Sequence, residues 1–238
     1  TVEAGGTAEN TTIKAGGQQD VSGTDTSAII DGGQQTVKAG GKATGTTINK
    51  DGRQYVETGG TAEDTIINED GLMQNAGEDS GTTVKDGGVY ELGRYSYGSP
   101  DNPAYRYYGT AGASGLTVEA GGRAAVYAGT LTGATVSGKN TTLTLMTPKI
   151  GPGGYDLPLA LKGKVSVTDH ASLVSQREAD LSLSSQGTLI LKGDAGCPEE
   201  GCSWTVNSLA PDNGVVAFYD TAVTPVSDGG YQTLTTGS

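Results

Sequence analysis

An aliphatic residue followed four positions later by glycine recurs throughout the first half of the chain, as in Val37 and Gly41. Two such half-units make a repeat of 19 residues, because spacings of 11, 8 and 11 positions separate Val37, Ile48, Val56 and Ile67. A fixed period of this size is typical of stacked structural units and not of a globule built around one central core.

Each half-unit is a short run of threonine, valine and isoleucine that ends in Gly-Gly or Asp-Gly. Residues branched at Cβ suit a pleated surface, and glycine provides the positive φ that tight turns need. We therefore predict coils of two or three short strands, stacked as parallel strands about 4.8 Å apart. The predicted fold class is all-β: a right-handed, single-stranded parallel β-helix, a solenoid with loop excursions. Low-complexity disorder is the alternative for so glycine-rich a composition.

The repeat also predicts which residues lie above one another. Lys38 would lie beside Glu57, and Asn49 beside Asn68, because 19 positions separate the members of each pair. The inward aliphatic ladders are predicted to contain Val2, Val21, Val37 and Val56 on one face and Ile13, Ile29, Ile48, Ile67 and Val84 on another.

We predict two regions in the chain. Residues 1–146 form the regular 19-residue-repeat β-helix, with a tyrosine-rich insertion at 94–115, and residues 147–238 form a less regular continuation. Cys197 and Cys202 flank a short Pro- and Gly-containing segment, which predicts a small disulfide loop at 197–202 and an oxidising compartment. The alternative is a metal site, but such a site needs about four ligands and the chain has 1 histidine. We expect the chain to be a fragment of a longer protein.

Composition narrows the function classes. A formal net charge of −12 argues against nucleic acid as a partner, because nucleic-acid binding needs a basic surface. With 1 phenylalanine and 1 tryptophan the chain can fill a thin aliphatic column but not a bulky core. No nucleophile motif, phosphate loop or distinct carboxylate pair stands out from the repeats, so we expect no catalysis and no cofactor.

Two sets of residues are candidates for binding. Stacked polar residues of neighbouring repeats could meet the same residues on another copy, with many weak contacts supplying avidity. Tyrosine and arginine in the insertion offer contact area for a sugar or protein ligand, unless the insertion packs back onto the rod. The predicted self-association face comprises Thr46, Asn49, Asp51, Thr65, Asn68 and Asp70. The predicted ligand loop comprises Arg94, Tyr95, Tyr97, Tyr105, Arg106, Tyr107 and Tyr108.

The units VKAGGKATGTTINKDGRQ and VETGGTAEDTIINEDG resemble the imperfect 19-residue repeats of the self-associating autotransporters, the group of the adhesin AIDA and antigen 43. The resemblance covers about residues 1–127, and the GTLILKGD segment resembles the C-terminal part of such passenger domains. It implies a β-helix secreted to the cell surface of a Gram-negative bacterium and carried there by a C-terminal outer-membrane β-barrel. It also implies a role in adhesion and, in some members, heptose on serine or threonine.

From the residues and this resemblance together, we predict a non-enzymatic surface adhesin. Its partner would be another copy on a neighbouring cell, and homotypic association would promote aggregation and biofilm growth. An adhesin for a host glycan or protein, bound through the tyrosine-rich loop, is the alternative. A carbohydrate-active β-helix enzyme is a third reading, which would require a groove holding convergent carboxylates.

Overall fold

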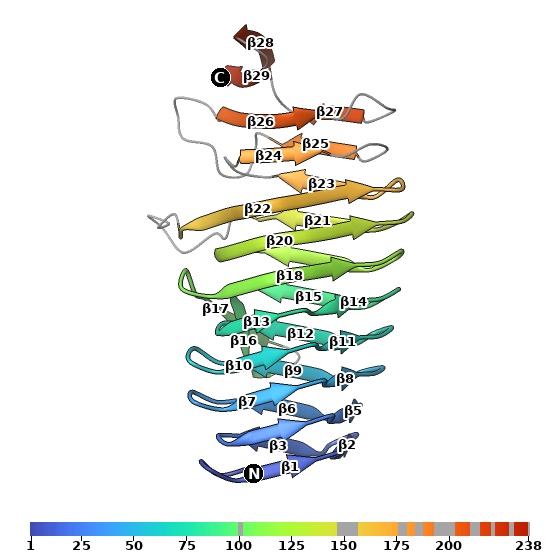
Figure 1. Cartoon of the computed structure of the whole chain (residues 1–238), viewed down its shortest axis with the longest axis vertical. Helices are drawn as coiled ribbons and strands as arrows, with labels where there is room; N and C mark the ends of the chain where they lie inside the picture. The colour runs from blue at the N-terminus through green and yellow to red at the C-terminus, as the bar shows by residue number, and fades with distance from the viewer. Residues whose placement is uncertain are drawn as a thin grey trace.

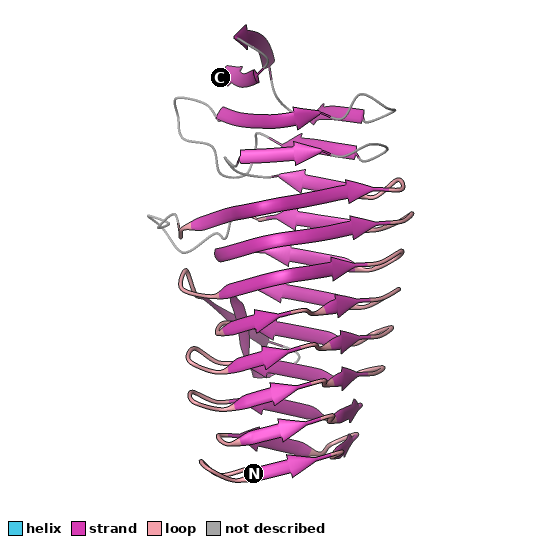
Figure 2. Cartoon of the chain, in the orientation of Figure 1, coloured by secondary structure: helices cyan, strands magenta, loops and turns pink. Residues whose placement is uncertain are grey.

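The computed structural model describes residues 1–99, 102–146, 157–175, 180–183, 188–192, 203–209, 215–219, 222–228 and 231–237. The secondary structure of these residues is β-strand, and the strands stack into a rod with the first strand at one end (Figures 1 and 2). The sheets that run along the rod are parallel, which confirms the predicted parallel β-helix.

Two long sheets form the sides of the rod. Corresponding strands of successive coils pair in sequence order, so a coil contributes strands to both sheets. One sheet contains β1 (Thr7–Glu9), β2 (Thr12–Lys14), β4 (Thr24–Thr26), β5 (Ile29–Asp31), β7 (Lys42–Thr44), β8 (Thr47–Ile48), β10 (Thr61–Glu63), β11 (Ile66–Ile67), β13 (Glu78–Ser80), β14 (Thr83–Val84), β18 (Gly112–Val118), β20 (Gly129–Ser137) and β22 (Leu159–Thr168). The other contains β3 (Gln18–Val21), β6 (Gln34–Val37), β9 (Arg53–Val56), β12 (Leu72–Asn75), β15 (Val89–Leu92), β19 (Arg123–Val126), β21 (Thr142–Leu145), β23 (Ser172–Ser175), β25 (Thr188–Lys192) and β27 (Val215–Tyr219).

Two smaller sheets complete the described strands. An antiparallel hairpin of β16 (Arg94–Ser99) and β17 (Asn102–Tyr107) interrupts the coils between β15 and β18. Toward the C-terminus a mixed sheet has the order β24-β26-β29-β28. It comprises β24 (Asp180–Leu183), β26 (Ser203–Leu209), β28 (Ala222–Asp228) and β29 (Tyr231–Gly237).

Aliphatic ladders fill the interior of the rod, as predicted. Val37 pairs with Val56 and Ile48 with Ile67, and all four side chains are buried. One predicted position is wrong: Ile29 is 41% exposed, and Ile30 is buried in its place. The reason is strand alternation, since Ile29 pairs with Thr12 and Thr47 on the outer face while Ile30 pairs with Ile13 and Ile48.

The bend between the first two strands of each coil needs a left-handed backbone. Asn10, Ser27, Gly45 and Asp64 have φ values of 53°, 58°, 67° and 52° at this bend in four successive coils. Glycine, asparagine and aspartate tolerate this region better than other residues. The bend therefore accepts small polar residues as well as glycine, and the residue at this position of the repeat varies from coil to coil.

The interior also holds a polar ladder. The Gln54 side-chain amide donates to Gln35 Oε1, and the Gln35 amide donates to Gln19 Oε1, each at 2.8 Å. The Gln35 amide also donates to Asp25 Oδ2 at 2.7 Å. The three glutamines are at most 8% exposed, and their hydrogen bonds satisfy groups that would otherwise be costly to bury.

Candidate functional site

Of the predicted self-association residues, two are buried, two are half-buried and two are exposed. Asn49 and Asn68 follow β8 and β11 at one edge of the rod, and the Asn68 amide donates to Asn49 Oδ1 at 2.9 Å. The predicted amide ladder is therefore present. Asp51 and Asp70 are exposed in the same turns, where they adopt positive φ, and Lys50 Nζ lies 3.9 Å from Asp70.

Thr46 and Thr65 do not belong to this surface. Their side chains are 1% and 0% exposed, so neither hydroxyl can touch a second molecule. The Thr65 hydroxyl donates to Gln54 Oε1 at 3.3 Å, which places it against the interior glutamine ladder. The two threonines occupy corresponding positions of neighbouring coils, as predicted, but their side chains point into the rod and not outward. The reason is strand alternation, since Thr46 and Thr65 directly precede the outward residues Thr47 and Ile66.

Asn49 and Asn68 are part of a longer row, which we name the turn-edge column. Each member directly follows an inward aliphatic residue of β2, β5, β8, β11, β14 or β18, and backbone hydrogen bonds continue from coil to coil along the row. Figure 1 shows the turns after these strands stacked along one edge. The turn-edge column comprises the first six positions of this row, which are Lys14, Asp31, Asn49, Asn68, Lys85 and Glu119, and its four charged members are exposed. The row continues with the uncharged Ser137 and Thr168, which follow Val136 and Val167.

Sequence reasoning missed four members of the column because coil length varies. Successive members are separated by 17, 18, 19, 17 and 34 positions, the last of which spans the hairpin. A fixed period of 19 therefore aligns Asn49 with Asn68 alone. The sequence does contain a pattern that identifies the members: each one directly follows the inward aliphatic residue of its strand, as Lys85 follows Val84.

The tyrosine-rich hairpin folds back onto the rod. Strand β16 contacts β12. Tyr55, Gln74 and Glu91 lie on the outer face of β9, β12 and β15, yet they are only 7%, 1% and 7% exposed. Figures 1 and 2 show the hairpin running alongside the coils of β9 to β15.

Arg94 fixes the base of the hairpin. One end of its guanidinium lies 2.9 Å from Glu91 Oε1, and Nη1 donates to the Tyr127 hydroxyl at 2.6 Å. The guanidinium also stacks on the rings of Tyr105 and Tyr127, at 4.2 and 4.6 Å from their centroids. Arg94 therefore holds the hairpin to the rod. Burial at this contact raises the pKa of Tyr127 to about 12.

The other predicted loop residues are distributed over both sides of the hairpin. Tyr105 is 41% exposed, and the half-buried Tyr107 ring lies 5.7 Å from that of Tyr127. Arg106 is exposed, and Tyr108 packs partly against the core. Tyr95 and Tyr97 lie in β16, where their backbones pair with Arg106 and Ala104.

Replacing Arg94 with alanine should detach the hairpin without unfolding the rod. Hydrogen bonds of a charged group contribute about 1.5–3 kcal/mol, so the population of the detached hairpin should rise about tenfold or more. Limited chymotrypsin digestion, which cuts after the hairpin tyrosines, should then be faster by that factor, while circular dichroism keeps its β signal. Arg123→Ala removes an exposed arginine from β19 as a control. Equal cleavage of the two variants would contradict the anchoring role.

The cysteine loop is the remaining site that the sequence predicts. Cys197 and Cys202 lie outside the described residues, so their disulfide stays a prediction. No group of three or more His, Cys, Asp or Glu side chains that could hold a metal ion occurs among the described residues. Within the same residues, no helix is long and apolar enough to cross a membrane.

Comparisons with known proteins point to one family. Residues 52–88 match the family model described as "Adhesin of bacterial autotransporter system, probable stalk". Over 171 residues, 69% of this chain, the sequence is 41% identical to the "Probable autotransporter YpjA" of Escherichia coli (strain K12). The chain spans 10% of the length of that relative.

A solved structure has the same fold. It is a hyper-glycosylated TibA fragment, whose glycosylation was catalysed by TibC, and it superposes with a TM-score of 0.53. The match covers 93% of this chain and 85% of that fragment at 23% sequence identity. At this identity the similarity concerns the fold alone, and it agrees with the parallel β-helix described above.

Proposed function

We propose that this chain, which belongs to the passenger region of an autotransporter adhesin, works at the bacterial cell surface by binding a second copy of itself. Association would occur along the turn-edge column and would hold neighbouring cells together, leading to aggregation and biofilm growth. The proposed role is adhesive and not enzymatic.

The charge order of the turn-edge column supports this proposal. From the N-terminal end the column reads Lys, Asp, Asn, Asn, Lys, Glu. Suppose that two rods lie antiparallel, with a twofold axis between Asn49 and Asn68. Asn49 of one copy then faces Asn68 of the other copy, and the reverse. The same axis places Asp31 opposite Lys85, and Lys14 opposite Glu119. The column is thus self-complementary, as an isologous interface requires.

The surroundings of the column fit such an interface. Among the described residues the exposed large hydrophobic side chains are Ile29, Ile66 and Tyr105, and the two isoleucines lie two positions before Asp31 and Asn68 on the outer face. The same twofold axis sets Ile66 opposite Thr47 and Ile29 opposite Thr83. Burial of these apolar groups would add to the polar contacts. Asp51 would face Asp70, a like-charged pair that belongs to the rim, where Lys50 lies close to Asp70.

Charge reversal within the column provides the test. Asp31→Lys and Lys85→Glu should each weaken self-association about 100-fold or more, because each places like charges together twice across the twofold axis. Sedimentation velocity of the purified chain and settling of bacteria that display it measure the effect. Glu9→Lys and Lys162→Glu make the same charge changes on other exposed strands and should leave association intact.

Mixing the two variants gives the sharper test. In a mixed pair the two substituted positions face each other with opposite charges, and the unchanged Lys85 of one variant faces the unchanged Asp31 of the other. The mixture should therefore associate although neither variant does alone, and the double variant D31K/K85E should associate by itself for the same reason. If the mixture and the double variant both stay monomeric, the antiparallel register is wrong. If both single variants associate like the parent chain, the turn-edge column is not the interface.

A further inference from the structure

A pocket of about 360 Å³ lies where the hairpin returns to the rod. Its lining comes from segments that are far apart in the sequence: Glu57 and Thr58 follow β9, Ala76 follows β12, and Arg106 and Tyr108 belong to the hairpin and its return. The pocket exists because the hairpin folds back, so no coil of the repeat could form it alone. Its volume is in the lower part of the range typical of small-ligand sites.

The walls of the pocket are held by backbone hydrogen bonds. The Glu57 and Ala76 amides donate to Val37 O at 2.9 Å and to Val56 O at 2.8 Å, and the Thr58 hydroxyl donates to Ala76 O at 3.3 Å. On the hairpin side the Tyr108 amide donates to Gly93 O at 2.8 Å. These contacts fix both walls before any ligand arrives, which reduces the ordering cost of binding.

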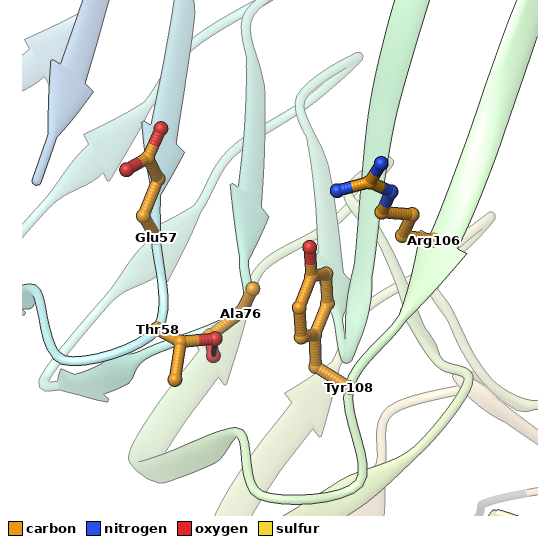
Figure 3. A pocket seen from close by; sticks show the side chains of 5 residues that line it. All are labelled: Glu57, Thr58, Ala76, Arg106 and Tyr108. Carbon is orange, nitrogen blue, oxygen red and sulfur yellow. Dashed lines mark hydrogen bonds between the residues drawn. The ribbon is translucent and has the colours of Figure 1, made fainter. Parts of the chain in front are cut away.

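The chemistry of the lining is mixed in a particular way. Figure 3 shows the Glu57 carboxylate and the Arg106 guanidinium on opposite sides of the opening, with the Tyr108 ring between them. Glu57 accepts hydrogen bonds and Arg106 donates them, while the tyrosine ring offers a flat apolar face with a polar tip. Lys38 Nζ lies 2.8 Å from Glu57 Oε1 and balances its charge.

We propose that this pocket binds one neutral pyranose unit of a glycan. Each sugar hydroxyl can both donate and accept, which suits a pocket with a carboxylate on one side and a guanidinium on the other. The C–H face of a pyranose ring is apolar and fits against Tyr108. A phosphate or acidic sugar is less suited, because Arg106 is the one cationic side chain among the described residues that line the pocket and the chain as a whole carries a net charge of −12.

Saturation-transfer difference NMR on the full chain tests the proposal. The probes are the methyl glycosides of glucose, galactose, N-acetylglucosamine and fucose, and at least one should receive saturation with a dissociation constant of about 1 mM or below. Glu57→Gln should weaken that binding about tenfold, because it replaces a charged acceptor with a weaker neutral one. Arg106→Ala should weaken it about tenfold or more, because it removes the guanidinium donors. If none of the four glycosides receives saturation at about 10 mM, the proposal is overturned.

Two control variants match these substitutions. Glu63→Gln removes a carboxylate of similar exposure, which lies 2.7 Å from Lys42, and Arg123→Ala removes an exposed arginine outside the pocket. Both should bind the glycoside like the parent chain. Equal loss in test and control variants would overturn the proposal, as would displacement of the glycoside by inorganic phosphate.

The pocket and the turn-edge column use different turns, so Glu57→Gln should not change self-association, and the two proposals can fail separately.

Discussion

Replacing Asp79 with asparagine should raise the melting temperature of the chain above about pH 8 and change it little near pH 4. Asp79 lies inside the rod between Ala62 and Ala113 of the adjacent coils and is 4% exposed. The Thr82 hydroxyl donates to its Oδ1 at 2.7 Å, whereas Oδ2 has no hydrogen bond of good geometry. Burial raises the pKa of this carboxyl to about 7, an effect that the nearby Thr82 and Tyr90 hydroxyls oppose in part.

The sign of the pH dependence follows from this raised pKa. The folded chain holds the proton more tightly than the unfolded chain, so the contribution of Asp79 to stability is fully present below pH 3.8 and is lost as the pH rises through about 7. A pKa difference of this size corresponds to at most about 4 kcal/mol. The asparagine amide needs a hydrogen-bond partner of its own, so we expect a net gain of about 1–3 kcal/mol.

Thermal unfolding followed by circular dichroism across this pH range measures the gain. For a chain of this length it corresponds to a rise in melting temperature of about 3–10 °C above pH 8. Asp86→Asn removes an exposed carboxylate and should shift the melting temperature by less than about 1 °C. A lower melting temperature for Asp79→Asn above pH 8 would show that the carboxylate is stabilising there.

The sequence was sufficient to predict the coils because their interior obeys a simple rule. In most of the regular coils an aliphatic residue returns to the inside at two corresponding positions, and the spacing of Val37, Ile48, Val56 and Ile67 records this directly. The error at Ile29 shows the limit of the rule. Where two isoleucines are adjacent, composition cannot decide which one faces inward, and only pairing with Ile13 and Ile48 selects Ile30.

The candidate sites were less predictable, because they depend on contacts between coils of unequal length. Asn49 and Asn68 were found because the two coils that contain them have the same length, whereas Asp31 and Lys85 needed the actual register. The pocket could not be predicted from the sequence for a different reason. Arg106 and Tyr108 were candidates as loop residues, but nothing in the repeat indicates that the hairpin lies against Glu57 and Ala76.

Replacing Gly41 with alanine should destabilise the rod strongly, whereas the same change at Gly40 should have a smaller effect. The two glycines of this Gly-Gly turn are required for different reasons. Gly40 has a φ of 78° and open space around the site of a Cβ atom, so alanine there meets only the cost of a left-handed backbone, about 1–2 kcal/mol. A Cβ atom on Gly41 would overlap with the Val21 carbonyl group of the coil below.

The overlap at Gly41 is with backbone, so no side chain can rotate to relieve it. Either the turn or the coil below must shift, and the Lys42 amide would then lose its 2.8 Å hydrogen bond to Gly23 O. We expect a loss of about 3 kcal/mol or more and a fall in melting temperature of about 10 °C. Hydrogen exchange should show the loss of protection around β6 and β7. Equal destabilisation at Gly40 and Gly41 would mean that backbone conformation alone, and not the close approach of successive coils, requires glycine in these turns.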